Sequence, residues 1–370
     1  QVSDAFESGM NFRGFEDALD GLFARADQLA AEELVRGQRV FLPRPAQAGL
    51  QCRLALAASA APDAPSSAPR GGGHGLWTAG MEGMLRVWRA AVPFTLLRSL
   101  AIPLRDEEAS RRGQAARLAL RLFDTPLPPR LLQRRAPMAP WQGLTLPFET
   151  RRLQLWHRPD GAARPRVLLL HGWSGQAGQM RGLAQACWDA GLSPFVLDWP
   201  AHGRSSGSRT DIAQWQRALQ VLTVEQGPWV GIAAHSIGAL AAAHGVARGL
   251  PARRLALLAC SAPPRHLLEG FVASFGLGGA VRDRIRQALE ARARPGLAGF
   301  EPDWLGQHLR LPVLLVHDRH DRAVPASYSE ALAAALPEAT LQLTEGLGHR
   351  RLLDDPAVQQ QVARWMAAAA

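Results

Sequence analysis

Apolar residues between position 167 and position 343 gather in short continuous runs, and most of these runs open into a polar or glycine-rich stretch. A strand that is buried on both faces of a parallel sheet shows such an unbroken run instead of an alternation. Stretches with helical spacing separate several of the runs, which is typical of an α/β fold. The predicted strands are Val167–Leu170, Phe195–Leu197, Trp229–Ala234, Leu255–Cys260, Leu311–Val316 and Ala339–Leu343. The sequence therefore predicts a mostly parallel, doubly wound sheet.

The sequence Ala-His-Ser-Ile-Gly at positions 234–238 joins a predicted strand to a helix of small residues, Ala239–Ala247. A nucleophilic serine at a sharp strand-to-helix turn has a strained backbone, so the residues two before and two after it must be small. Alanine and glycine stand at those two positions, although glycine is usual at both. Ser236 is therefore the predicted nucleophile, and an ordinary strand end is the alternative.

A nucleophilic serine needs a base and a carboxylate that orients the base, and in such sheets they follow in the order serine, acid, histidine. Asp321 lies in the polar stretch that leaves the strand Leu311–Val316, and it is better placed than Asp318. His349 follows the next strand in a loop with flanking glycines, which free the loop to direct the histidine across the sheet. Asp321 alone fits a turn aspartate and His349 alone fits a surface histidine, but their order and strand-end positions favour a Ser-His-Asp triad.

Acyl transfer passes through a tetrahedral oxyanion, which needs two preorganised backbone N–H donors. Ile237 follows the predicted nucleophile and offers one, and Trp173 offers the other from the loop after Val167–Leu170. The alternative for that loop is a simple glycine-rich turn. In the next such loop, Asp198 and His202 are interpreted as structural residues that fix the loop by hydrogen bonds.

These motifs resemble those of the α/β-hydrolase superfamily, and within it the bacterial serine hydrolases of the esterase and lipase-like branch. The resemblance runs from Leu144 to the C-terminus and rests on the turn around Ser236 and on three loops, His-Gly-x-x-Gly at 171–175, Asp-x-Pro-x-His-Gly-x-Ser at 198–205 and Gly-x-Gly-His at 346–349. It implies the α/β-hydrolase fold and the roles given above to the triad and to the two oxyanion donors. The sequence departs from the pattern at Ala234 and Asp318, where glycine is common.

The serine nucleophile narrows the chemistry within this fold. Dehalogenases and epoxide hydrolases of this architecture use an aspartate nucleophile, and Tyr328, the single tyrosine of the chain, lies outside any predicted cap. Serine with an oxyanion hole indicates acyl chemistry through a covalent acyl-enzyme. We therefore expect a carboxylesterase-like serine hydrolase that acts on small to medium apolar acyl esters. The alternatives are a lipase, a thioesterase or a lactonase with the same triad, or a non-catalytic binding protein with this fold.

An insertion of about fifty residues separates Leu255–Cys260 from Leu311, and two of its segments, His266–Phe275 and Val281–Ala293, have helical spacing. We expect a small helical cap at about 262–310 over the nucleophile, with a hinge at the glycines of 276–279. Its apolar residues either line an acyl pocket or pack on the core, and packing is favoured for each one. They are Leu267, Leu268, Phe271, Val272 and Phe275.

The composition fits one large α/β domain with an appendage, because 370 residues with 47% hydrophobic residues bury a sizeable core. The formal charge of +10 comes from arginine spread over the chain, without a nucleic-acid-binding signature, so no nucleic-acid partner is expected. Three widely separated cysteines indicate neither a disulfide framework nor a zinc site. We expect no metal, no organic cofactor and a reducing, cytoplasmic location. The expected partner is a small-molecule ester. The sequence does not indicate whether the protein forms oligomers.

The N-terminal third divides into two predicted regions. Residues 1–80 form an extension that is partly linker or disordered, because residues 56–75 are rich in alanine, proline, serine and glycine. Residues 81–140 form a helical segment that packs on the hydrolase domain at 141–370. The apolar stretch 85–104 contains three arginines, which argues against a membrane span. An amphipathic helix with weak peripheral membrane contact is the alternative to packing.

Overall fold

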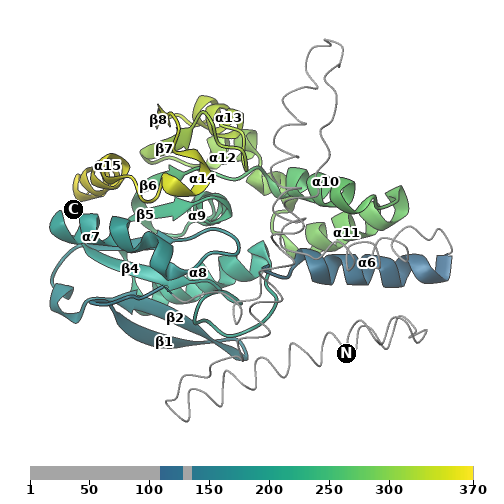
Figure 1. Cartoon of the computed structure of the whole chain (residues 1–370), viewed down its shortest axis with the longest axis horizontal. Coiled ribbons are helices and arrows are strands. Elements are labelled where there is room, and N and C mark those ends of the chain that lie inside the picture. Colours follow the sequence, from purple (N-terminus) through teal and green to yellow (C-terminus); the bar gives the residue numbers. More distant parts are fainter. Residues whose placement is uncertain (1–108, 128–135, 370) are drawn as a thin grey trace, which may run out of the picture. The chain divides into compact units, whose positions relative to one another are not determined.

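The structure is a computed structural model that describes residues 109–127 and 136–369. Within these residues, eight strands form one sheet in the order β1-β2-β4-β3-β5-β6-β7-β8 (Figure 1). β2 pairs antiparallel with β1 and with β4, and the other neighbours are parallel. The strands are β1 Gln142–Phe148, β2 Arg151–His157, β3 Arg166–Leu170, β4 Ser193–Asp198, β5 Trp229–His235, β6 Ala252–Leu258, β7 Val313–Asp318 and β8 Ala339–Thr344. The mostly parallel sheet confirms the predicted fold class.

All six predicted strands are present, with ends that differ from the predicted ones by at most three residues. One shift is at β7, which begins at Val313 and not at Leu311. Pro312 stands before it and has no N–H to donate to a neighbouring strand, although its carbonyl accepts a hydrogen bond from Leu255 N–H. The shift carries the end of the strand to Asp318, so the acid loop starts immediately after that residue.

Helices cover both faces of the sheet (Figure 1). α7 and α15 pack on one face, while α9 and α13 pack on the other and α8 contacts α9. The inner strands are apolar on both sides, and residues 167–170 of β3 are fully buried. The helices and turns around the sheet are η1 Pro159–Gly161, η2 Ala177–Met180, α7 Arg181–Asp189, α8 Ile212–Gln226, α9 Ile237–Ala247, α13 Ser327–Ala335, α14 Gly348–Arg351 and α15 Pro356–Ala367.

The predicted insertion lies between β6 and β7 and is helical. It contains α10 Pro264–Phe275, α11 Gly279–Arg292, η3 Leu297–Phe300 and α12 Pro302–His308. Gly276 caps the C-terminus of α10. Its φ of 61° is left-handed and turns the chain toward α11. We call α10 and α11 the cap helices.

A helix from the N-terminal third joins the cap. α6 Ala109–Phe123 lies along α11 (Figure 1), and its last residue, Phe123, meets Phe271 of α10 edge to face at 5.2 Å. The sequence predicts that segment 81–140 packs on the hydrolase core, whereas α6 contacts a cap helix. Its remaining parts, 81–108 and 128–135, and the extension 1–80 lie outside the described residues.

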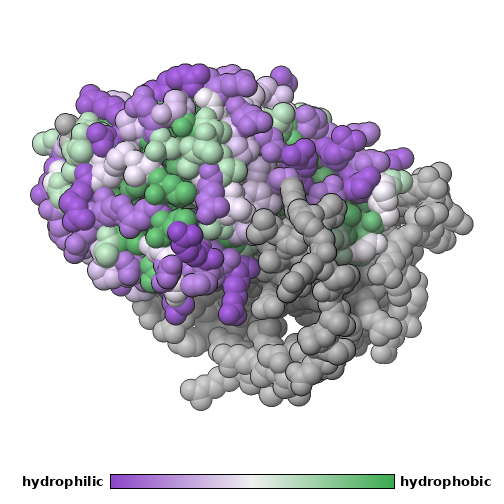
Figure 2. Space-filling view, turned by 90° about the horizontal axis from the view of Figure 1, so that it is seen from above, coloured by the Kyte–Doolittle hydropathy of each residue, from purple (hydrophilic) through white to green (hydrophobic). Residues whose placement is uncertain are grey.

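The large apolar side chains of the described residues are mostly buried. Val224 is the single large apolar side chain among them that is mostly exposed, and the face in Figure 2 is largely hydrophilic with smaller apolar areas. Among the described helices, none is both long and apolar enough to cross a bilayer.

Two buried histidines fasten the loops after β3 and β4. His202 Nδ1–H donates to the Pro200 carbonyl at 2.9 Å, and its Nε2 accepts from Ser174 N–H at 2.9 Å. His171 likewise donates from Nδ1 and accepts from Trp199 N–H. Burial lowers the pKa of His202 to about 3 and that of His171 to about 4. Both rings are therefore neutral when the protein is folded.

Asp198 connects the same loops. Its carboxylate accepts hydrogen bonds from Ala177 N–H at 2.7 Å, from the Trp156 indole at 3.1 Å and from Arg204 N–H at 3.2 Å. The hydrogen bonds of Asp198 and His202 agree with their interpretation as structural residues.

The neutral His202 predicts a pH dependence of stability. Because the unfolded chain takes up a proton near pH 6.5 and the folded chain only near pH 3, the free energy of unfolding falls as the pH drops through that window. His202→Gln should flatten this slope by up to about 1.4 kcal/mol per pH unit, since glutamine does not titrate. It should also cost about 1–3 kcal/mol at pH 8 through poorer hydrogen bonds. Urea unfolding between pH 4.5 and 8 measures both effects, and an unchanged slope would contradict a neutral His202.

Candidate active site

Ser236 stands at the turn between β5 and α9, as the sequence predicts. Its φ is 57° and its ψ is −127°, a conformation that side-chain-bearing residues rarely adopt. The neighbouring strand holds this backbone, because Ser236 N–H donates to the Leu258 carbonyl at 2.9 Å and Ser261 N–H donates to the Ser236 carbonyl at 3.2 Å. The turn places Ser236 directly after the carboxyl end of β5, at that edge of the sheet.

The turn also explains the small residues around it. A Cβ atom at Gly238 would clash with the backbone carbonyl of His171, and a Cβ atom at Gly172 would lie 2.8 Å from the Ser236 Cβ. Ala234, where glycine is usual, is fully buried within β5. A methyl group at that position is therefore compatible with the turn.

The structure brings the three predicted triad residues together. His349 Nε2 lies 3.0 Å from Ser236 Oγ, and His349 Nδ1 lies 2.7 Å from the Oδ2 atom of Asp321. The side chain of His349 is 17% exposed, while that of Asp321 is fully buried. A proton path thus runs from the hydroxyl to the imidazole, with the carboxylate behind it.

Asp321 is held in place by several donors. Its Oδ1 accepts from Ala323 N–H at 2.8 Å and from Val324 N–H at 2.9 Å. Its Oδ2 also lies 3.2 Å from Nε2 of His317, a fully buried ring. Burial alone would raise the pKa of Asp321, but the hydrogen bonds from His317, His349 and Val324 hold it well below its usual range. Asp321 is therefore ionised throughout the pH range in which enzymes work.

Two further residues anchor the loop that carries His349. Asp318, at the end of β7, accepts hydrogen bonds from the Thr344 hydroxyl and from Leu347 N–H, both at 2.9 Å. His235, which precedes the nucleophile, donates from Nε2 to the His349 carbonyl at 2.8 Å. Neither residue was predicted to contact this loop, although both lie beside predicted site residues.

Trp173 and Ile237, the predicted oxyanion donors, line the same cavity. Within the described residues, neither backbone N–H donates to another backbone group. The Trp173 loop is fixed by its neighbour Ser174, which has a φ of 56° and donates its N–H to His202. The hydroxyl oxygen of Ser174 accepts from Leu127 N–H at 3.1 Å, so the segment after α6 also supports this loop.

A cavity of about 50 Å³ opens beside both donor residues, and we call it the inner cavity. Its walls are mainly apolar and come from α6, from the cap helices and from η3. The apolar side chains among them include Phe123, Leu267, Leu289 and Leu297. Leu267 thus lines a pocket, whereas the other predicted cap residues, Leu268, Phe271, Val272 and Phe275, are buried in packing.

The inner cavity includes residues that the sequence did not single out. Phe123 and Asp124 line it from the end of α6, and Arg292 lines it from the end of α11. Arg292 bonds to Asp124 at 2.7 Å and to Asp211 at 3.3 Å. Burial raises the pKa of Asp124 to about 6, against the opposing effect of Arg292. No pattern near Phe123 distinguishes it from an ordinary helix end, so reasoning from the sequence had no signal to find it.

The comparisons with known proteins point to one superfamily. The model of the family described as TAP-like protein, an α/β-hydrolase family, matches residues 298–370. The pimeloyl-[acyl-carrier protein] methyl ester esterase of Aromatoleum aromaticum is 28% identical over 240 residues, which are 52% of this chain and 94% of that protein. The monoacylglycerol lipase of Mycolicibacterium smegmatis is 28% identical over 262 residues, which are 56% and 90% of the two chains.

Among solved structures, Est1E from Butyrivibrio proteoclasticus is similar with a TM-score of 0.49 and 16% identity, over 61% of this chain and 98% of that one. The strand order, the strained turn at Ser236 and the sequence relatives agree with the resemblance drawn from the motifs. The chain therefore has the α/β-hydrolase fold, and it is similar to esterase- and lipase-type enzymes.

Proposed function

We propose that this protein is a serine carboxylesterase that hydrolyses small-molecule esters of small to medium apolar acyl groups. The observation that carries the proposal is the hydrogen-bonded chain from Ser236 through His349 to Asp321, with distances of 3.0 and 2.7 Å. An oriented base next to a serine hydroxyl is the arrangement that activates a serine for acyl transfer. Two relatives that the chain resembles are named as an esterase and a lipase, which supports an ester as the substrate.

In the first half of the proposed reaction, Ser236 Oγ attacks the ester carbonyl and His349 Nε2 takes the hydroxyl proton. The carbonyl oxygen becomes an oxyanion and accepts hydrogen bonds from Trp173 N–H and Ile237 N–H. His349 then returns the proton to the alcohol oxygen as the carbon–oxygen bond breaks. The alcohol leaves and the acyl group stays on Ser236 as an ester.

In the second half, water takes the place of the alcohol. The oxygen of the water attacks the acyl carbonyl while His349 accepts a proton from the water. The oxyanion forms again at the same two N–H groups. Collapse of this intermediate breaks the bond to Ser236 Oγ, which regains the proton from His349. The carboxylic acid leaves and the enzyme is restored.

Asp321 has two roles in the proposed cycle: it orients the imidazole of His349, and it supplies a negative charge beside that ring. It accepts a hydrogen bond from Nδ1–H of His349, so Nε2 stays free to act as the base, and its charge stabilises the imidazolium that forms during attack. His317 and the backbone donors keep the carboxylate ionised and fixed. These contacts limit the reorganisation that the reaction requires.

A cytoplasmic, reducing location is part of the proposal. Cys187 and Cys260 are buried free thiols. Free thiols are the ordinary state of cysteine in such a compartment. Their burial also separates them from the proposed chemistry at Ser236.

Ser236→Ala should abolish the acyl-enzyme route and lower kcat for a p-nitrophenyl ester by about 10⁶-fold. Labelling with a fluorophosphonate probe should disappear in the same variant. Ser274→Ala is the matched control, because among the described residues the Ser274 hydroxyl donates to the Gly270 carbonyl within α10, and its loss should leave rate and labelling unchanged. Hydrolysis by the Ser236 variant at the wild-type rate would refute the proposed nucleophile.

Asp321→Asn should lower kcat by about 10⁴-fold, because the amide favours the wrong imidazole tautomer. Asp318→Asn should have a much smaller effect, since Asp318 acts on the loop of His349 and not on the ring. Steady-state kinetics of both variants, with circular dichroism to check folding, give the comparison. If Asp318→Asn were the more damaging change, the acid would be misassigned by three residues.

A further inference from the structure

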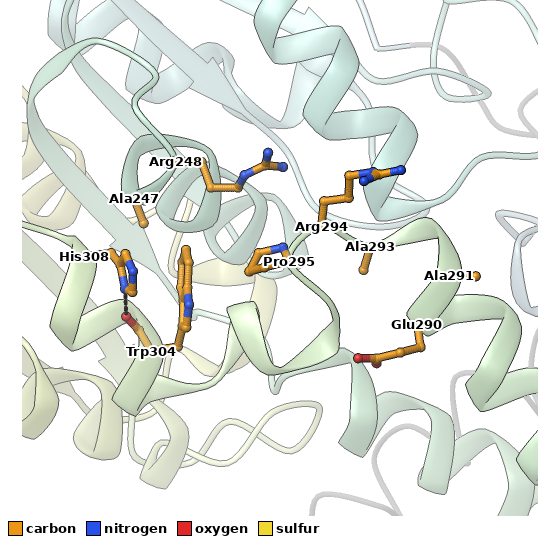
Figure 3. Close-up of a pocket in the computed structure, with 9 residues that line it drawn as sticks. All are labelled: Ala247, Arg248, Glu290, Ala291, Ala293, Arg294, Pro295, Trp304 and His308. Atoms are coloured by element: carbon orange, nitrogen blue, oxygen red, sulfur yellow. Dashed lines mark hydrogen bonds between the residues drawn. The ribbon is translucent and has the colours of Figure 1, made fainter.

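A second cavity lies next to the inner one. It has a volume of about 580 Å³, and its lining includes Ala247 of α9, Pro295, and Trp304 and His308 of α12 (Figure 3). We call it the outer cavity. Ala293, which is buried at the end of α11, lines both cavities. The short segment 293–297 therefore separates the two spaces.

Leu297 occupies the inner side of this segment and Pro295 the outer side. Leu297 is 7% exposed, and its N–H donates to the Glu290 carboxylate at 3.0 Å, so the segment is fixed to α11. Since Leu297 is a wall of the inner cavity and the outer cavity lies beyond the same segment, shortening its side chain would enlarge the inner cavity toward the outer one.

Another part of the described lining of the inner cavity is charged. The cluster of Arg292, Asp124 and Asp211 stands at its lining, and its charges pair with one another. An alkyl chain that packs against these charged groups displaces their water and offers them no hydrogen bond. This desolvation costs free energy. This part of the lining therefore disfavours extension of an acyl chain toward the cluster.

The volume of the inner cavity limits what it accepts. At about 50 Å³ the inner cavity is far smaller than ordinary ligand pockets of roughly 300–1,000 Å³, and it is about a third of the roughly 150 Å³ apolar cavity that admits benzene. We propose that the acyl group of the substrate occupies the inner cavity and that Leu297, with Ala293, restricts it to short chains of about two to four carbons. This inference rests on the proposed esterase function and specifies its substrate class.

The test uses the full chain and p-nitrophenyl esters of acetate, butyrate and octanoate. The wild type should show a kcat/KM for butyrate at least about 10-fold above that for octanoate. Leu297→Ala should raise the octanoate-to-butyrate ratio by at least about 10-fold, because each accommodated methylene contributes about fourfold. Leu277→Ala is the matched control. Leu277 also lies in the insertion between β6 and β7 and is also 7% exposed, but it does not line the inner cavity.

A second variant tests the same wall in the opposite direction. Ala293→Val should fill part of the inner cavity and lower the butyrate-to-acetate ratio severalfold, so a Leu297 variant that fails to fold does not decide the question. A wild-type preference for octanoate, or equal effects of Leu297→Ala and Leu277→Ala on all three esters, would overturn the proposed wall. If none of the esters is hydrolysed and the fluorophosphonate probe does not label Ser236, the esterase function itself fails instead.

Discussion

The left-handed backbone of Ser236 is the constraint on which the arrangement of the site depends. A non-glycine residue in such a conformation costs of order 1–3 kcal/mol, so the surrounding structure must hold it there. The last residue of β6, Leu258, and Ser261 in the loop after β6 each make a backbone hydrogen bond with the residue, and α9 continues directly from it. The same turn brings the loop of Gly172 and the start of α9 so close together that glycine is required on both sides.

This constraint explains why much of the fold was predictable from the sequence. Strands buried on both faces have to be apolar throughout, so the runs that became β3, β5, β6 and β7 were visible as such. The sharp turn demands small residues at fixed spacing, and strand order fixes where the acid and the base follow. Polar residues placed immediately after buried strands therefore identified the neighbourhoods of Ser236, Asp321 and His349.

The rest of the site depends on contacts between segments that are far apart in the sequence. Phe123 and Leu127 contact the cap and the Trp173 loop from a part of the chain that carries no motif, and an amphipathic helix end has no feature that predicts its partner. The anchoring role of Asp318 was missed for a related reason. An aspartate at the end of a strand can accept hydrogen bonds from several neighbouring donors. The backbone conformation of the loops nearby determines which donors it contacts.

The hydrogen bond from His235 to the His349 carbonyl has a mechanical consequence. His235 is the residue next to Ser236 on β5, so the strand that carries the serine is attached directly to the backbone of the residue that carries the imidazole. This contact ties the backbone position of His349 to the residue that precedes Ser236, so it helps to set the separation between Ser236 Oγ and His349 Nε2.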